Sequence, residues 1–118
     1  MKTAISSTGN DLESRIDPRF GRAPYFVFLE EEPDAELNVY ARKNPASEAA
    51  SGAGTEAAQL VIKEKVRTVI SGAVGPNAYE VFERVGIDVY LVQGNVTVKE
   101  AYEKFKEGAL QKMSIKRL

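Results

Sequence analysis

The chain has 118 residues, 43% of them hydrophobic, which is enough for one domain with a real core. Sixteen Lys and Arg residues against 17 Asp and Glu residues give a net charge of −1, which is not the charge of a nucleic-acid-binding protein. The sequence contains no Cys and no His, which excludes disulfides, thiolate nucleophiles, Cys/His zinc sites, Ser-His-Asp triads and iron–sulfur clusters held by protein thiolates.

The first half of the chain predicts three strands. Residues 2–7 form the first, and because this start is too short and too polar for a secretory signal, we expect a cytoplasmic protein. Residues 25–29 form the second. Residues 36–42 alternate between apolar and polar side chains, which predicts a half-exposed strand antiparallel to its predecessor. No apolar run approaches the roughly 20 residues that cross a bilayer, so no membrane contact is expected.

The second half predicts helices that alternate with strands. In chain order we expect a helix beginning near Thr55, a strand over 66–71, a helix beginning near Pro76, a strand over 87–92 and a helix beginning near Val98. The apolar residues that repeat with helical spacing in the second helix, and that should be largely buried, are Ala78, Val81, Phe82 and Val85. Gly86 should end that helix, and Thr97 with Glu100 should form a capping box before the third.

The order β-β-β-α-β-α-β-α predicts a single α/β domain over residues 1–118. Strands separated by helices favour right-handed parallel crossovers, so we expect a mixed sheet of about five strands flanked by helices. This order is similar to ribonuclease H-like folds, whose nucleases need carboxylates on central strands to hold two metals. Strands 3–7 and 66–71 contain no carboxylate. Residues 112–118, with Lys112, Lys116 and Arg117, are expected to form a solvated basic tail.

The most informative stretch is the run Asp17-Pro18-Arg19-Phe20-Gly21-Arg22. Proline fixes its own φ and restricts the residue before it, so this segment is stiffer than an ordinary loop. Guanidinium groups stay charged and present a planar fork of donors that suits phosphate, carboxylate and other oxyanions. The run therefore predicts a rigid anion clamp made by Arg19 and Arg22. The alternative is a structural turn in which Asp17 pairs with one arginine.

Two glycine-rich turns precede helices, and both are candidate anion cradles. Gly52 and Gly54 lie before the first helix, while Gly72, Gly75 and Asn77 lie before the second. Glycine lets the backbone approach a ligand closely, and a helix start offers unpaired N–H donors. No strand directly precedes the first turn, which argues against a dinucleotide site, and neither turn continues into the Gly-Lys-Ser/Thr of a P-loop. An ordinary connection is the alternative for both turns.

These motifs resemble those of the dinitrogenase iron–molybdenum cofactor biosynthesis family, which includes NifX-like proteins and NifB C-terminal domains. The matching segments cover nearly the whole chain in collinear order and comprise residues 17–22 with Phe26, residues 52–54 with Ala57 and Ala58, Ser71 with Gly72, residues 75–78, residues 85–87 and residues 97–101. The resemblance implies a ribonuclease H-like α/β fold without nuclease activity. It also implies binding or carrying of iron–molybdenum cofactor, a negatively charged cluster, or of its precursors.

The main hypothesis is a non-enzymatic binding or carrier protein for an anionic metallocluster or a related anionic ligand. The cluster would be iron–molybdenum-cofactor-like or an iron–sulfur precursor, and it would arrive preassembled with its own coordination sphere. The two arginines would supply charge, Phe20 a wall, and the glycine-rich turns a cradle of amides. The expected ligand-binding residues are Arg19, Phe20, Gly21, Arg22, Gly52, Gly54, Gly72, Gly75 and Asn77.

Two alternatives come from other functional classes. The chain could be a protein-interaction module that regulates cofactor delivery without holding a ligand, using residues 36–42 as an exposed edge strand for strand addition. It could also be a hydrolase that uses Asp11, Asp17 and a metal. The absence of converging carboxylates in the predicted elements argues against the hydrolase.

Overall fold

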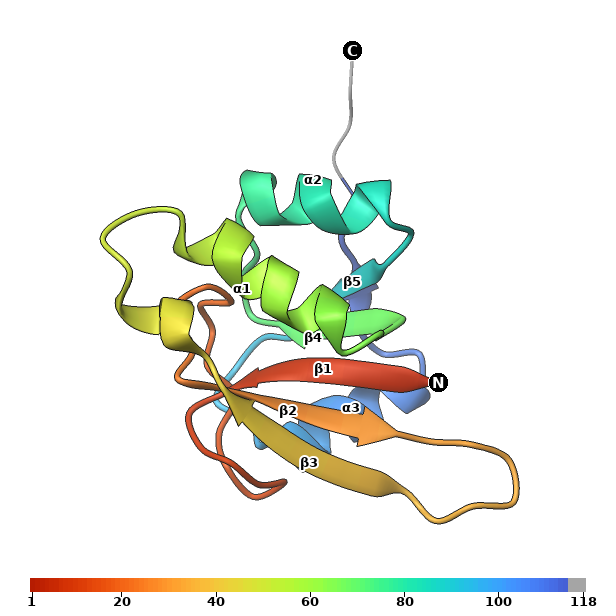
Figure 1. Ribbon diagram of the computed structural model, residues 1–118. Coiled ribbons are helices and arrows are strands. Elements are labelled where there is room, and N and C mark those ends of the chain that lie inside the picture. Colours follow the sequence, from red (N-terminus) through yellow and green to blue (C-terminus); the bar gives the residue numbers. More distant parts are fainter. Residues whose placement is uncertain (115–118) are drawn as a thin grey trace.

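A computed structural model of the chain describes residues 1–114, which form a mixed sheet with helices on both faces (Figure 1). The strands are β1 Lys2–Ser7, β2 Tyr25–Glu30, β3 Asn38–Lys43, β4 Thr68–Ser71, β5 Asp88–Leu91 and β6 Gln111–Lys112. The helices are α1 Ala53–Lys63, α2 Pro76–Arg84 and α3 Val98–Lys106, preceded by a short 3-10 helix, η1, at Pro45–Glu48. Within residues 1–114, no helix is long and apolar enough to cross a membrane.

The sheet has the order β3-β2-β1-β4-β5-β6. The first three strands form an antiparallel meander, β4 pairs parallel with both β1 and β5, and β6 pairs antiparallel with β5. The predicted mixed α/β sheet is therefore confirmed, but it has six strands where about five were expected. A strand of two residues has no periodicity, so the sequence pattern gives no sign of β6.

β6 begins inside the segment that was expected to be a basic tail. Lys112 is the register partner of Tyr90, and its Nζ lies 3.2 Å from Asp88 Oδ1. Lys112 is thus part of the sheet and not of a solvated tail. Lys116 and Arg117 lie outside the described residues.

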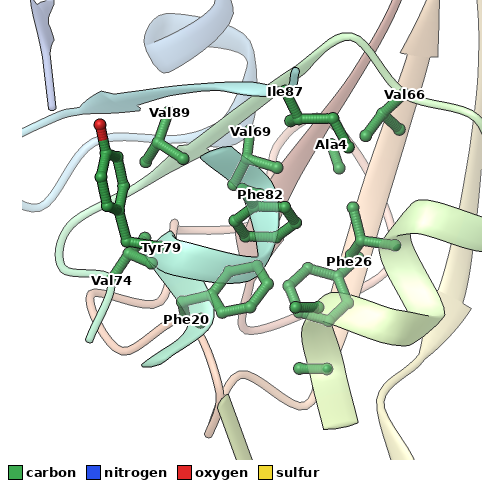
Figure 2. Packing of buried hydrophobic residues seen from close by; sticks show 14 of the residues in the cluster. Ala4, Phe20, Phe26, Val66, Val69, Val74, Tyr79, Phe82, Ile87 and Val89 are labelled. Atoms are coloured by element: carbon green, nitrogen blue, oxygen red, sulfur yellow. The ribbon is translucent and has the colours of Figure 1, made fainter. Parts of the chain in front are cut away.

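The helices divide the core into two parts. α1 and α2 cover one face of the sheet and α3 covers the other (Figure 1). On the α1–α2 face, the Phe82 ring lies 5.4 Å from Phe20 in an edge-on arrangement, and Phe20 lies 5.0 Å from Phe26 (Figure 2). On the α3 face, Val98 and Ala101 pack in a second cluster with residues of the central strands.

The helix starts agree with the sequence pattern more closely than the helix ends. α2 and α3 begin at Pro76 and Val98 as predicted, the capping box of α3 is present, and α1 begins at Ala53, slightly before the expected position. Of the α2 residues expected in the core, Ala78 and Phe82 are buried and Val81 is half-buried.

The prediction that Val85 is largely buried is wrong, because this side chain is 53% exposed. α2 ends at Arg84, so Val85 is already the C-cap residue. Gly86 follows with φ 78°, a left-handed conformation that turns the chain away from the helix axis. The apolar repeat therefore continues in sequence after the helix has ended.

Glu31 links the end of β2 to α3 and should make the free energy of unfolding depend on pH in the acidic range. Its carboxylate accepts hydrogen bonds from Lys106 and Tyr102, and these lower the pKa of Glu31. A carboxyl whose pKa is lowered by folding stabilises the protein above its unfolded pKa, and this contribution disappears as the pH falls through the folded pKa. We expect Glu31→Gln to destabilise the protein near neutral pH, with a difference from wild type that shrinks below about pH 4.5. Urea unfolding between about pH 6 and pH 3 measures this, with exposed Glu36→Gln as the control.

Candidate functional site

Four loops meet at one edge of the sheet, which we call the carboxyl edge: residues 8–24, 44–52, 72–75 and 92–97. Because β1, β4 and β5 are parallel, the loops that leave them start at the same edge. β3 runs in the same direction, and its continuation through η1 leads to α1 (Figure 1, left). Ligands of open α/β sheets gather at this edge. All three sequence motifs lie here.

The 17–22 run is held between the start of α1 and the β4–α2 turn. The N–H of Phe20 donates to the carbonyl of Ala73 over 3.1 Å. A Cβ added to Gly21 would lie 2.8 Å from Cα and N of Gly54, and one added to Gly72 would lie 2.7 Å from Cα of Pro18. The three motifs that the sequence shows separately are therefore in direct contact.

Buried hydrogen bonds fix the beginning of the run to the two central strands. The Ser6 hydroxyl donates to the Asp17 carbonyl over 2.7 Å, and it lies 2.8 Å from the hydroxyl of Ser71. The N–H of Asp17 donates to the Ser6 carbonyl over 3.0 Å. All three residues are buried. Since Ser6 is on β1 and Ser71 is on β4, the run has a rigid base.

Arg19 carries the exposed charge of the site. Asp17 Oδ1 accepts the backbone N–H of Arg19 at 2.9 Å and its Nε at 3.4 Å, so part of the predicted structural turn is present. The Arg19 side chain is nevertheless 67% exposed. Among residues 1–114 its two terminal nitrogens have no hydrogen-bond partner. One edge of the guanidinium is oriented by Asp17 and the other is free for an anion.

Arg22 points into the neighbouring loop. Its Nη1 donates to the carbonyls of Ser47 at 3.2 Å and Ala49 at 2.5 Å, at the end of η1. These carbonyls have no N–H donor from a following helical turn, because the 3-10 helix ends here. The two predicted arginines therefore do not point at one place: Arg19 is free, and Arg22 ties the run to the loop that leads into α1.

Asn44 is a structural residue of the site that the sequence analysis missed. Its side chain is buried, and Nδ2 donates to the carbonyls of Gly21 at 3.1 Å and Ala23 at 2.8 Å. Its Oδ1 accepts the N–H of Ala46 at 3.1 Å and so caps η1. The available signal was the Asn44-Pro45 pair, since Asn before Pro is typical of a helix start.

Phe20 lies in the core beneath the site. Its side chain is 2% exposed and its ring packs between Phe26 and Phe82 (Figure 2). The expectation that Phe20 forms a wall facing the ligand therefore has to be corrected to a supporting role. Of the other predicted residues, the exposed ones are Gly52, Gly75 and Asn77, and the half-buried ones are Gly21, Gly54 and Gly72.

The two helices that start at the carboxyl edge beside the 17–22 run have no side-chain cap. The N-cap residues are Gly52 for α1, with φ 72°, and Gly75 for α2, and neither can supply a side-chain acceptor. By contrast, Thr97 and Glu100 cap α3 in both directions. First-turn N–H groups of an uncapped helix are unpaired donors at the positive end of the helix dipole. α1 and α2 therefore offer unpaired donors at the carboxyl edge, where the 17–22 run packs on the start of α1 and on the β4–α2 turn.

A pocket of about 360 Å³ opens beside Gly72 at the ends of β4 and β5. It is lined by the ends of these strands and by the C-terminal part of α3, including Gln93 and Lys104. Because Gly72 also touches Pro18, this pocket adjoins the 17–22 run. It provides room of the size that small ligands occupy.

The carboxylates proposed for a hydrolase are used in turns. Asp11 accepts the N–H groups of Glu13 and Ser14 and the hydroxyl of Ser14, and Asp17 orients Arg19. Among residues 1–114, no three His, Cys, Asp or Glu side chains gather in a way that could hold a metal ion. The arrangement of side chains does not support metal-dependent hydrolysis at Asp11 and Asp17.

Gly21 should tolerate no side chain. Gly21→Ala places a methyl group against the backbone of α1, which has to move, so we expect a loss of about 1–3 kcal/mol of unfolding free energy. The matched control is Gly75→Ala, because a Cβ at Gly75 meets nothing within 4 Å and its φ of −68° suits alanine. Chemical denaturation measures the unfolding free energy of both variants. Equal stability of the two would mean that the run does not pack against α1 as described.

A family model described as dinitrogenase iron-molybdenum cofactor matches residues 1–108 of the chain. An uncharacterised protein of Methanocaldococcus jannaschii is 36% identical over 113 residues, which cover 95% of this chain and 91% of that protein.

Solved structures show the same fold. The apo form of the orange protein from Desulfovibrio gigas matches with a TM-score of 0.85 and 30% identity, covering 96% of this chain and 92% of that one. A Thermotoga protein with a provisional NifB assignment, solved by NMR, matches with a TM-score of 0.77 and 32% identity, covering 98% and 97%.

Proposed function

This chain belongs to the dinitrogenase iron–molybdenum cofactor family, and on that basis we propose that it is a non-enzymatic carrier of an anionic metallocluster at the carboxyl edge. The cargo is an iron–molybdenum-cofactor-like cluster or an iron–sulfur precursor. It brings its own coordination sphere, because the chain has no Cys or His to ligate it. The cluster passes to a partner in cofactor assembly.

The observation that carries the proposal is that the 17–22 run contacts the start of α1 and the β4–α2 turn, and that α1 and α2 have no side-chain cap. Arg19 supplies a fixed positive charge, and the first turns of α1 and α2 supply backbone donors. Gly52, Gly75 and Asn77 are exposed around these donors, so a large anion has access to them. Each of these features is common alone, but here they lie together at the carboxyl edge, where Asp17 is engaged by Arg19 and Glu56 is the acidic residue in the first turn of α1.

Close backbone packing and side-chain hydrogen bonds both position this cradle. Gly21 and Gly72 let the run lie directly on the backbone of α1 and the β4–α2 turn, and Arg22 with Asn44 fixes the loop that leads into α1. A site held by packing loses little entropy when it binds a ligand. The similar structure of the orange protein is that of an apo form, the term for a protein without its ligand. A ligand-binding protein of the same fold supports the proposal.

Mixing the purified protein with isolated iron–molybdenum cofactor, followed by gel filtration and metal analysis, tests the proposal. We expect molybdenum and iron to elute with the protein, at about one cluster per chain. The competing function, a protein-interaction module that holds no ligand, predicts that the protein elutes without metal. If the Arg19→Ala variant retained the metal to the same extent as wild type, the cluster would lie elsewhere.

A further inference from the structure

A groove of about 730 Å³ lies beside η1, and Arg19 is not among its lining residues. We call it the docking groove. It is lined by the end of β3, the start of β2, the C-terminal half of α1 and part of η1. Its apolar lining comes from Pro24, Tyr25, Pro45 and Leu60.

Basic side chains border this groove, and two of them are unpaired in the described part of the chain. Arg42, Lys43 and Lys63 line it together with the carboxylates Glu48 and Glu64. Glu64 is already occupied, since it accepts the Tyr40 hydroxyl at 2.8 Å and lies 3.5 Å from Arg42 Nε. In the described part of the chain, neither Lys43 nor Lys63 makes a side-chain hydrogen bond or ion pair. Two exposed lysines are therefore available to an acidic partner.

The groove continues into an open sheet edge. β3 is the outermost strand on this side, so one row of its backbone N–H and C=O groups faces outward. Leu37, immediately before β3, is 42% exposed. Charged residues at a strand edge often serve only to prevent pairing, but such protection does not require an apolar groove beside the strand.

We propose that β3 and the docking groove bind an extended acidic segment of a partner protein, which adds to the sheet as a further strand. Alternate side chains of an added strand point to the α1 face, where apolar ones enter the groove. Acidic residues of the segment lie against Lys43 and Lys63. A small anion would not need the open strand edge, and an RNA has no apolar side chains to fill a groove lined by Pro24, Tyr25 and Leu60. This surface shares Asn44 and Ser47 with the loop that positions the cluster site, but the proposal does not rest on cluster binding.

The test uses a fluorescent ten-residue peptide in which Glu or Asp alternates with Val or Ile. Fluorescence anisotropy should show saturable binding to the wild-type chain and at least a tenfold weaker affinity for the double variant Lys43→Glu, Lys63→Glu. The control is Lys99→Glu with Lys104→Glu, which makes the same charge change on α3, across the sheet from α1. Equal weakening by both double variants, or no binding of the peptide to wild type, would overturn the proposal.

A second peptide separates strand addition from simple charge attraction. N-methylation of alternate residues removes the backbone donors of the peptide and keeps its charges, so it should weaken binding at least tenfold. Equal affinity of the methylated peptide would contradict strand addition. Arg19→Ala should leave peptide binding unchanged, so that a failure of this proposal and a failure of the cluster proposal give different results.

Discussion

Phe82→Ala should lower the unfolding free energy by about 3–5 kcal/mol, the range for emptying a buried aromatic site. The ring is 0% exposed and lies above Phe20 and Phe26 in the core between the sheet and α2 (Figure 2). Removing the Phe82 ring leaves Phe20 without its edge-on partner. Phe20 is the residue of the 17–22 run whose ring packs in the core between Phe26 and Phe82. We therefore expect the largest loss of stability among single alanine substitutions in α2. Urea or guanidinium unfolding measures it.

The matched control for this prediction lies three residues further along the chain. Val85→Ala should change stability by less than about 0.5 kcal/mol, because Val85 is 53% exposed and follows the end of α2. A loss below about 1 kcal/mol for Phe82→Ala would mean that the face of α2 packed on the sheet is not the one described. Similar losses for both variants would contradict the end of α2 at Arg84.

Replacing the two arginines should weaken cluster binding by several kcal/mol. Arg19→Ala removes the free charge, which at about 1.5–3 kcal/mol for each charged hydrogen bond corresponds to roughly a ten- to hundredfold loss of affinity. Its effect on stability should stay below about 1 kcal/mol, since the side chain is 67% exposed. Arg22→Ala should cost more stability, about 1–3 kcal/mol, because it breaks the bonds to the Ser47 and Ala49 carbonyls.

Binding titrations with isolated iron–molybdenum cofactor and urea unfolding of each variant test this division of roles. Arg84→Ala is the control, because Arg84 is an exposed arginine at the far end of α2 and pairs with Glu80. It should leave binding unchanged. If the double variant unfolds while the remaining native protein still binds cofactor normally, both arginines are structural and the cluster site is not at the 17–22 run.

Much of the fold was predictable because its elements carry strong local signals. The capping box of Thr97 and Glu100 and the proline at the start of α2 mark helix starts that hold in the structure. Val85 shows the limit of the same reasoning, since an apolar repeat does not reveal where the hydrogen bonds of a helix end. β6 shows another limit, because two paired residues leave no pattern in the sequence.

The site was predictable as a set of motifs, but the direction of each side chain was not. Helix starts and turns that follow parallel strands come together at the carboxyl edge, so contact between the motifs follows from topology. The partner of Arg22 depends on where η1 stops, which is a long-range property of the fold. Phe20 has the same sequence context as its exposed neighbours, and its burial depends on the space left by Phe26 and Phe82.

The most direct test of the central claim is to record which backbone amides of the ¹⁵N-labelled protein respond to isolated iron–molybdenum cofactor. Because the cluster is proposed to lie against Arg19 and the starts of α1 and α2, we predict that amide signals of residues 19–22, 52–55, 72–75 and 77 shift or broaden first. Signals of β3 and of α3, which lies on the opposite face of the sheet, should change little. Changes centred on β3 or α3, or no change at a cofactor concentration above that of the protein, would contradict a cluster site at the carboxyl edge.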